Sequence, residues 1–172
     1  VKLDSVGNVE WENTIGGDEY DYLYCVEPTQ DNGAVIGGYS TSSVSGDKTE
    51  AWLGSGGDFW ILKIDEFGNI EWQNTIGGDD PDWPFNITTN AEGQFIIKGY
   101  SESGISGDKT EVNQGYFDYW TIKLDVDGNL IWQKTIGGNN QDYLYSIQQT
   151  TDGGYILGGG SESDISGEKT ED

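Results

Sequence analysis

Acidic side chains gather in three short loops, each of which follows a Thr-Ile-Gly-Gly stretch. Carboxylate oxygens this close together in a Gly-flanked loop are ligands that Ca²⁺ takes together with backbone carbonyls and water. The pattern therefore predicts calcium sites and no other cofactor. The predicted ligands are Asp18, Glu19, Asp21, Asp79, Asp80, Asp82 and Asp142.

The same loops admit a second interpretation that needs no metal. They lack the fixed twelve-residue pattern of an EF-hand, and Asn139 and Asn140 replace two carboxylates in the third loop. A short Asp side chain in a turn accepts hydrogen bonds from nearby backbone N–H groups. In this alternative the last Asp of each loop stabilises its turn. Asp58 and Asp118, which directly precede aromatic residues, are predicted to hydrogen-bond a neighbouring loop.

The carboxylates do not form the pattern of an active site. Glycosidases place one pair of carboxyl groups about 5 to 10 Å apart, whereas the acids here recur in every copy of a repeat. The chain has no His, no Gly-x-Ser-x-Gly and no phosphate-binding loop. We therefore expect no enzymatic activity. Cys25 is replaced by Asn86 and Ser146 in the other copies, so we interpret it as a small, half-buried filler.

The chain is strongly acidic, with 31 Asp and Glu against 8 Lys and Arg and a formal net charge of −23. A surface of this sign repels phosphate groups, so nucleic acid and anionic membranes are not expected partners. No segment approaches the roughly 18 apolar residues of a membrane-spanning helix, and no membrane insertion is expected. The absence of Met leads us to expect an internal or processed piece of a longer chain.

An internal repeat of about 60 residues is the strongest signal. Its first part reads Lys-(Leu/Ile)-Asp-x-x-Gly-Asn-x-x-Trp, and the last part of each copy reads Ser-Gly-(Asp/Glu)-Lys-Thr-Glu. The constant Trp residues are predicted to pack in the core, as wedges between neighbouring structural units. They are Trp11, Trp72 and Trp132. We assign repeat 1 to residues 1–62, repeat 2 to residues 63–122, and repeat 3, which lacks its last strand, to residues 123–172.

Each repeat contains four short segments that favour β-strands. Residues 59–64 are rich in aromatic and β-branched types. A tight Asp-x-x-Gly-Asn turn follows, in which we expect Gly and Asn to take positive φ. Residues 69–76 alternate between apolar and polar, and residues 143–150 and 155–159 are joined by a Gly-containing turn. No segment shows a helical period.

Four antiparallel strands repeated at a constant period predict an all-β, β-propeller-like array of three four-stranded blades. Three blades do not close a ring, for which four to eight are usual, so we expect part of a larger ring or assembly. Another β-solenoid or an open stack of sheets is the alternative.

The repeat also resembles a known family. The residues that carry the resemblance lie between Gly137 and Gly159 and between Asp58 and Asn69. They are similar to the β-propeller repeats of large secreted bacterial proteins, the SBBP-type family, and to the variant found in surface proteins exported by the type IX route. This resemblance implies a propeller and an extracellular or cell-surface location in a bacterium. It implies no activity, because such repeats serve as scaffolds and adhesive modules.

Two functions of different kinds follow. The first is a structural and adhesive module that self-assembles through open blade edges, with neighbouring copies or flanking repeats as partners. The second is a lectin-like module that binds a surface glycan or a protein, with calcium as a stabilising ion. The aromatic residues that would stack on sugar rings are Tyr20, Tyr22, Tyr24 and Trp52.

Overall fold

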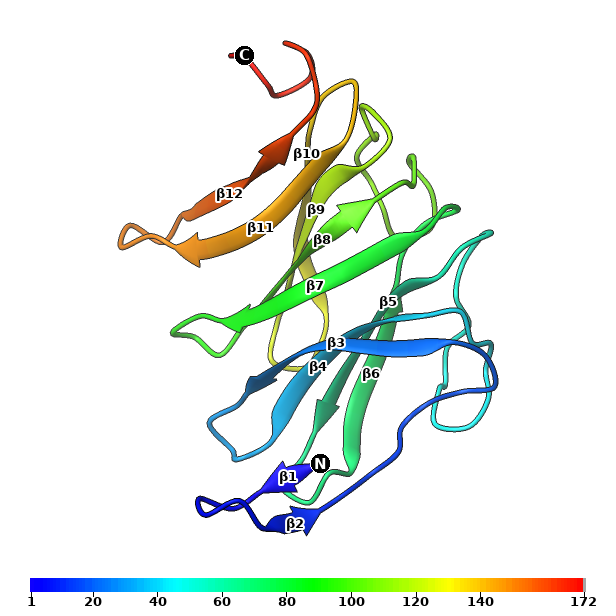
Figure 1. Ribbon diagram of the computed structural model, residues 1–172, viewed down its shortest axis with the longest axis vertical. Coiled ribbons are helices and arrows are strands. Elements are labelled where there is room, and N and C mark those ends of the chain that lie inside the picture. Colours follow the sequence, from blue (N-terminus) through cyan, green and yellow to red (C-terminus); the bar gives the residue numbers. More distant parts are fainter. Residues whose placement is uncertain (172) are drawn as a thin grey trace.

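The computed structural model describes residues 1–171, which form twelve β-strands and no helix (Figure 1). The strands are β1 (Lys2–Leu3), β2 (Val9–Trp11), β3 (Asp21–Pro28), β4 (Ala34–Ser40), β5 (Asp58–Ile64), β6 (Ile70–Ile76), β7 (Asp82–Thr89), β8 (Phe95–Ser101), β9 (Asp118–Leu124), β10 (Leu130–Ile136), β11 (Asp142–Gln149) and β12 (Tyr155–Ser161). The predictions of an all-β fold and of four strands at a constant period are therefore confirmed. Within residues 1–171 there is no helix with the length and apolar character needed to cross a membrane.

The strands pair with their neighbours in sequence to form four antiparallel sheets. The first full sheet contains β3, β4, β5 and β6 in that order, and the second full sheet contains β7, β8, β9 and β10. A two-stranded sheet stands at each end: the N-terminal sheet, β1–β2, and the C-terminal sheet, β11–β12. Figure 1 shows the four sheets following one another in chain order along the longest axis.

The repeat shows which strands of a full sheet each end sheet corresponds to. The sequence of β11–β12 corresponds to that of β3–β4 and of β7–β8, which are the first two strands of each full sheet. The sequence of β1–β2 corresponds to the last two strands, β5–β6 and β9–β10. Each end sheet therefore contains one half of the strands of a full sheet, and the halves are different.

The turn between the last two strands of each sheet depends on Asp and Gly. In the first full sheet Gly68 has a φ of 84°, a left-handed conformation that glycine adopts without strain. Asp65 accepts hydrogen bonds from the backbone N–H groups of Phe67 and Asn69. The expectation of positive φ at Asn69 is wrong: its side chain instead donates to the Asp65 carboxylate, at 2.8 Å.

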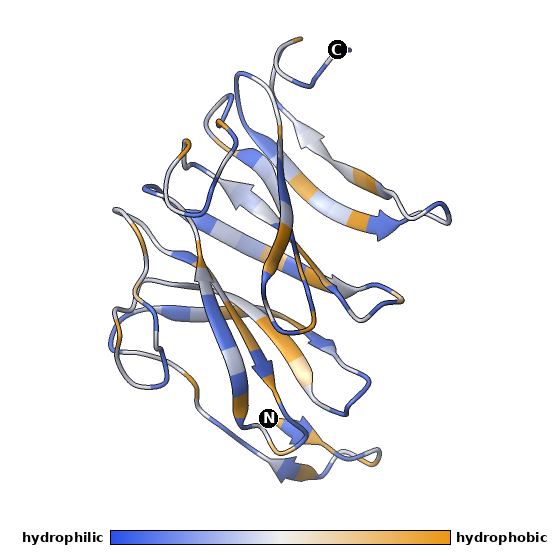
Figure 2. Ribbon diagram, turned by 180° about the vertical axis from the view of Figure 1, so that it is seen from behind, coloured by the Kyte–Doolittle hydropathy of each residue, from blue (hydrophilic) through white to orange (hydrophobic). Residues whose placement is uncertain are grey.

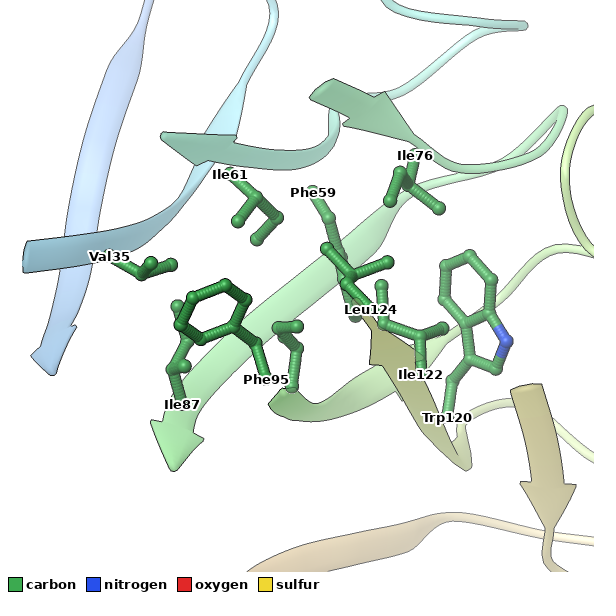
Figure 3. Packing of buried hydrophobic residues seen from close by; sticks show 10 residues of the cluster. Val35, Phe59, Ile61, Ile76, Ile87, Phe95, Trp120, Ile122 and Leu124 are labelled. Atoms are coloured by element: carbon green, nitrogen blue, oxygen red, sulfur yellow. The ribbon is translucent and has the colours of Figure 1, made fainter. Parts of the chain in front are cut away.

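The hydrophobic core lies between the two full sheets, and Figure 3 shows side chains of both sheets meeting there. The rings of Phe59 on β5 and Trp120 on β9 are 4.9 Å apart, centroid to centroid. The buried members of the cluster are Val35, Phe59, Ile61, Ile76, Ile87, Phe95, Ile97, Trp120, Ile122 and Leu124. Figure 2 shows that hydrophobic segments lie on strands in the middle of the molecule. Because full burial of such a side chain contributes about 1.5 to 3 kcal/mol, this interface holds the full sheets together.

The recurring Trp residues link consecutive sheets, as predicted. The indole N–H of Trp11 donates to the carbonyl of Glu66 at 2.9 Å, in the turn between β5 and β6. Trp72 makes the same contact one sheet further on, donating to the carbonyl of Val126 at 3.2 Å. Its ring also packs on Phe95, with centroids 5.9 Å apart.

Candidate functional site

The constant Asp of each acidic loop is held inside its own turn. Asp82 is 0% exposed, and one of its oxygens accepts hydrogen bonds from the N–H of Gly78 at 2.8 Å and the hydroxyl of Ser103 at 3.1 Å. The same pair of donors recurs at Asp21 and at Asp142. Three loops therefore use one carboxylate in the same way, as a cap for the Gly-Gly turn.

The other predicted calcium ligands point elsewhere. Asp18, Glu19, Asp79 and Asp80 are exposed on the loops, and the Asp18 carboxylate accepts a hydrogen bond from Ser45 at 2.6 Å. In the part of the chain that the structure describes, residues 1–171, no three Asp, Glu or Cys side chains gather into a group that could hold a metal ion. The geometry thus supplies a hydrogen-bonding role for the constant Asp, as in the second interpretation of these loops, and calcium binding is left to experiment.

Asp58 and Asp118 are a second, deeper set of acids. Asp58 is 0% exposed and accepts a hydrogen bond from the N–H of Leu53 at 2.6 Å, and Asp118 does the same for Gln114 at 2.5 Å. The sequence prediction that they bind a neighbouring loop is therefore confirmed. Burial raises the pKa of Asp58 to about 8, and the nearby Asp82 charge adds to the effect. Burial also raises the pKa of Asp118 to about 6.

Two buried lysines, Lys48 and Lys109, complete this region, and each is 1% exposed. Lys48 donates to the hydroxyl of Thr75, and its ammonium lies 5.4 Å from the centroid of the Trp60 ring, which is a cation–π distance. Burial lowers the pKa of Lys48 to about 8. The sequence analysis did not predict these buried lysines, although the constant Lys of the Ser-Gly-(Asp/Glu)-Lys-Thr-Glu motif was their signal.

Cys25 is half-buried and packs against the core between the full sheets. Burial raises the pKa of its thiol to about 11. A thiol with this pKa is protonated at neutral pH and is a poor nucleophile. This placement agrees with the interpretation of Cys25 as a small filler.

A ladder of exposed aromatic rings runs along the start of β3. Tyr20, Tyr22 and Tyr24 are 66%, 50% and 48% exposed. Their ring centroids are 6.2 and 6.3 Å apart, and the planes of neighbouring rings are within 9° and 14° of parallel. Phe85 of β7 continues the ladder, 6.3 Å from Tyr24. Trp52, the fourth predicted sugar-stacking residue, is half-buried in the segment before β5, and no ring contact joins it to the ladder among the described residues.

An apolar groove of about 520 Å³ opens between the N-terminal sheet and the first full sheet. Leu23, Val26 and Ile36 form its wall on β3 and β4, and Val1 and Trp11 form the opposite wall. Leu23 and Val26 are 43% and 65% exposed. The groove therefore exposes apolar side chains that a folded chain normally covers.

The C-terminal sheet has a matching exposed region. Ile156 on β12 is 64% exposed, whereas Val35 and Ile96, at the equivalent places on β4 and β8, are 0% and 1% exposed. In the full sheets β4 pairs with β5 and β8 pairs with β9. Within residues 1–171, β12 pairs with β11 alone. One edge of β12 thus presents backbone groups and apolar side chains without a partner strand.

Comparison of the chain with protein-family models gives no match, and comparison with curated proteins gives no significant match either. Each position is therefore compared only with its equivalents in the other repeats of this chain.

Proposed function

We propose that the chain is a structural and adhesive repeat module at a bacterial cell surface, built from β-propeller-type sheets and assembled through its open ends. The observation that carries this proposal is the relation between the end sheets. One end supplies the first two strands of a sheet and the other end supplies the last two. The strands of the N-terminal sheet are short, with two and three residues, so the long open edge is that of the seven-residue β12.

The exposed apolar side chains at both ends support assembly. Leu3 on β1 is 55% exposed, while its equivalents Ile64 and Leu124 are 5% and 0% exposed inside the full sheets. Long unpaired strand edges recruit further strands unless the edge is blocked. The resemblance of the repeat to secreted bacterial propeller repeats supports the surface location and the adhesive role.

Sedimentation velocity over a wide range of protein concentration tests this proposal. The expected result is a mass that rises above that of one chain as the concentration increases, without any added ligand. A mass of one chain at every concentration would contradict assembly through the open ends. The negative charges of two copies repel each other. The measurement is therefore made at physiological salt, where the Debye length is about 8 Å and this repulsion is screened.

A second candidate function is carbohydrate binding on the tyrosine ladder. Three nearly parallel, exposed rings offer apolar faces and phenol hydroxyls, which suit the faces and hydroxyls of sugar rings. Titration with soluble oligosaccharides, followed by intrinsic fluorescence, tests this candidate. Tyr22→Ala is expected to abolish the binding, whereas Tyr116→Ala, which removes an exposed tyrosine outside the ladder, is the matched control. Equal loss in both variants, or no binding to the parent chain, would exclude the ladder as the sugar site.

A further inference from the structure

An exposed aromatic residue stands at the same place on β3, β7 and β11. The place is a β-bulge: the pairing of β7 with β8 shifts its register between Pro84 and Asn86, and Phe85 is the extra residue. A bulge of this kind re-aims a side chain relative to the regular pleat. Tyr24 and Tyr145 occupy the equivalent bulges. They are 48% and 71% exposed and Phe85 is 41% exposed, so every copy of the repeat keeps an aromatic ring at the surface.

The exposure of Phe85 does not come from a missing neighbour. The first full sheet precedes its strand and the C-terminal sheet follows it: β7 contacts β3 and β4, and β8 contacts β11. Figure 1 shows β7 between β3 and β11. A ring that stays uncovered with sheets on both sides is available to a partner.

Further rings join Phe85 to form one surface. The ring of Tyr100 on β8 lies 4.9 Å from that of Phe85 and 6.1 Å from that of Tyr143 on β11, centroid to centroid. Tyr24 on β3 lies 6.3 Å from Phe85. This surface, named here the aromatic face, consists of Tyr24, Tyr39, Trp83, Phe85, Tyr100, Phe117 and Tyr143. It extends over three consecutive sheets.

Carboxylates border the aromatic face. The backbone N–H of Glu102, two residues after Tyr100, donates to the carbonyl of Pro81 at 3.0 Å, which ties Glu102 to the second acidic loop. Burial raises the pKa of Glu102, and the charge of Asp80 adds to the effect. Burial also raises the pKa of Tyr100 to about 12, and the neighbouring Tyr143 and Glu102 add to the effect. The edge of the face is therefore negative.

The basic residues of the chain are already engaged elsewhere. There are eight, all of them Lys, against 31 Asp and Glu. Lys48, Lys63, Lys98 and Lys109 are buried. Lys98, two residues before Tyr100, donates to the carbonyl of Tyr145. The remaining Lys residues also have partners within the chain. The acids beside the aromatic face are therefore left for cations from outside the chain.

We propose that the aromatic face is a docking surface for a basic polypeptide segment, whose Lys and Arg side chains lie over the rings with their charges toward the acidic edge. Aromatic rings attract ammonium and guanidinium groups, and the planar guanidinium also stacks on them. A negative potential speeds the encounter with a cationic partner. Because the face extends over three sheets, it suits an extended chain. This partner differs in kind from the further copies of the proposed function.

A fluorescein-labelled deca-arginine peptide, followed by fluorescence anisotropy at physiological salt, tests the proposal. Phe85→Leu keeps an apolar side chain and removes the ring. Phe67→Leu is the matched control, because it removes a 68% exposed ring in the turn between β5 and β6. The expected result is saturable binding to the parent chain, with a dissociation constant about fivefold higher in Phe85→Leu and unchanged in Phe67→Leu.

The net charge is the same in both Leu variants. Equal affinity in the two would therefore show attraction by the net charge alone and would overturn the proposal, as would an absence of binding to the parent chain. Tyr24→Leu removes a second ring of the face, on the neighbouring sheet, and is expected to weaken binding in the same way. The melting temperature of each variant is measured first, so that a loss of binding is read only from folded protein.

Glu102→Gln tests the acidic edge. It removes one charge beside the face and is expected to raise the dissociation constant about twofold and to reduce its dependence on salt. Glu12→Gln, at an exposed position outside the face, is the control. Equal effects of the two changes would overturn the placement of the cations.

A neutral oligosaccharide provides the last comparison. Binding of the sugar that Phe85→Leu abolishes, without binding of deca-arginine, would assign the face to carbohydrate and overturn the proposal. None of these outcomes decides whether the chain assembles, which sedimentation velocity measures in the absence of peptide and sugar.

Discussion

Val26 on β3 and Ile87 on β7 occupy equivalent places on the first strands of consecutive sheets, yet Val26 is 65% exposed and Ile87 only 2%. The difference comes from the preceding sheet. Ile87 faces the complete first full sheet and lies in the core with Val35. Val26 faces the N-terminal sheet, which has only the two short strands β1 and β2 within residues 1–171. The burial of this position therefore depends on how many strands the preceding sheet has.

Replacement of Val26 by Asp is expected to abolish assembly. Burial of an aliphatic side chain contributes about 1.5 to 3 kcal/mol, and a buried unpaired carboxylate adds a desolvation cost. We therefore expect the dissociation constant of the assembly to rise at least tenfold. Sedimentation velocity measures the change. The control is Val44→Asp, which alters an equally exposed valine outside the groove. Association of Val26→Asp as strong as that of the parent would argue against the groove as an interface.

Replacement of Trp72 by Ala is expected to lower the free energy of unfolding by about 3 kcal/mol, because truncation removes the packing on Phe95 and the hydrogen bond to Val126. Trp132→Ala is the matched control. Trp132 packs on Tyr155, but its indole N–H donates no hydrogen bond within residues 1–171. We expect it to cost about 1 kcal/mol. Urea denaturation measures both changes, and equal costs would contradict the role of Trp72 as a link between sheets.

Stability is expected to decrease as the pH rises from about 4 to about 8. Burial raises the pKa of Asp58 to about 8 and those of Asp82 and Asp118 to about 6, while an unfolded Asp titrates near 3.9. Above that value the unfolded chain has lost these protons and the folded chain has not, so each rise in pH favours unfolding until the folded groups also ionise.

Asp58→Asn should flatten this profile between about pH 6 and pH 8, because the amide has no proton to lose and its oxygen can still accept the hydrogen bond from Leu53. The slope removed is up to about 1.4 kcal/mol per pH unit. The control is Glu12→Gln at an exposed position. Unfolding free energies are measured in urea at each pH, and an unchanged slope in Asp58→Asn would show that Asp58 does not titrate in this range.

Calcium and its chelator EGTA are expected to leave the melting temperature unchanged. The constant Asp of each loop is already bound to protein donors, as Asp82 is to Gly78 and Ser103. Differential scanning calorimetry with excess Ca²⁺ and with EGTA makes the comparison. A higher melting temperature in Ca²⁺ that is lost in Asp79→Asn or Asp80→Asn would instead establish the predicted calcium loop.

The strands and turns could be predicted from the sequence because their causes are local. Aromatic and β-branched residues favour β5 and β9, and Gly68 marks a turn that requires positive φ. The error at Asn69 has a local cause too. Asn tolerates positive φ, but here the side chain of Asn69 donates a hydrogen bond to the Asp65 carboxylate and its backbone keeps a negative φ.

The burial of Lys48 could not be predicted, because it depends on contacts far along the chain. Lysine is rarely buried, and the groups that accommodate this one, Thr75 and the Trp60 ring, come from β6 and β5. The exposure of Val26 and Ile156 is a similar case. Their sequence pattern is that of core residues, and only the strand pairing shows which sheets leave them uncovered.

Sedimentation equilibrium of the unmodified chain is the most direct test of assembly through open strand edges. The account predicts an average mass that rises above that of one copy as the protein concentration increases. A single copy at all concentrations would contradict the central claim.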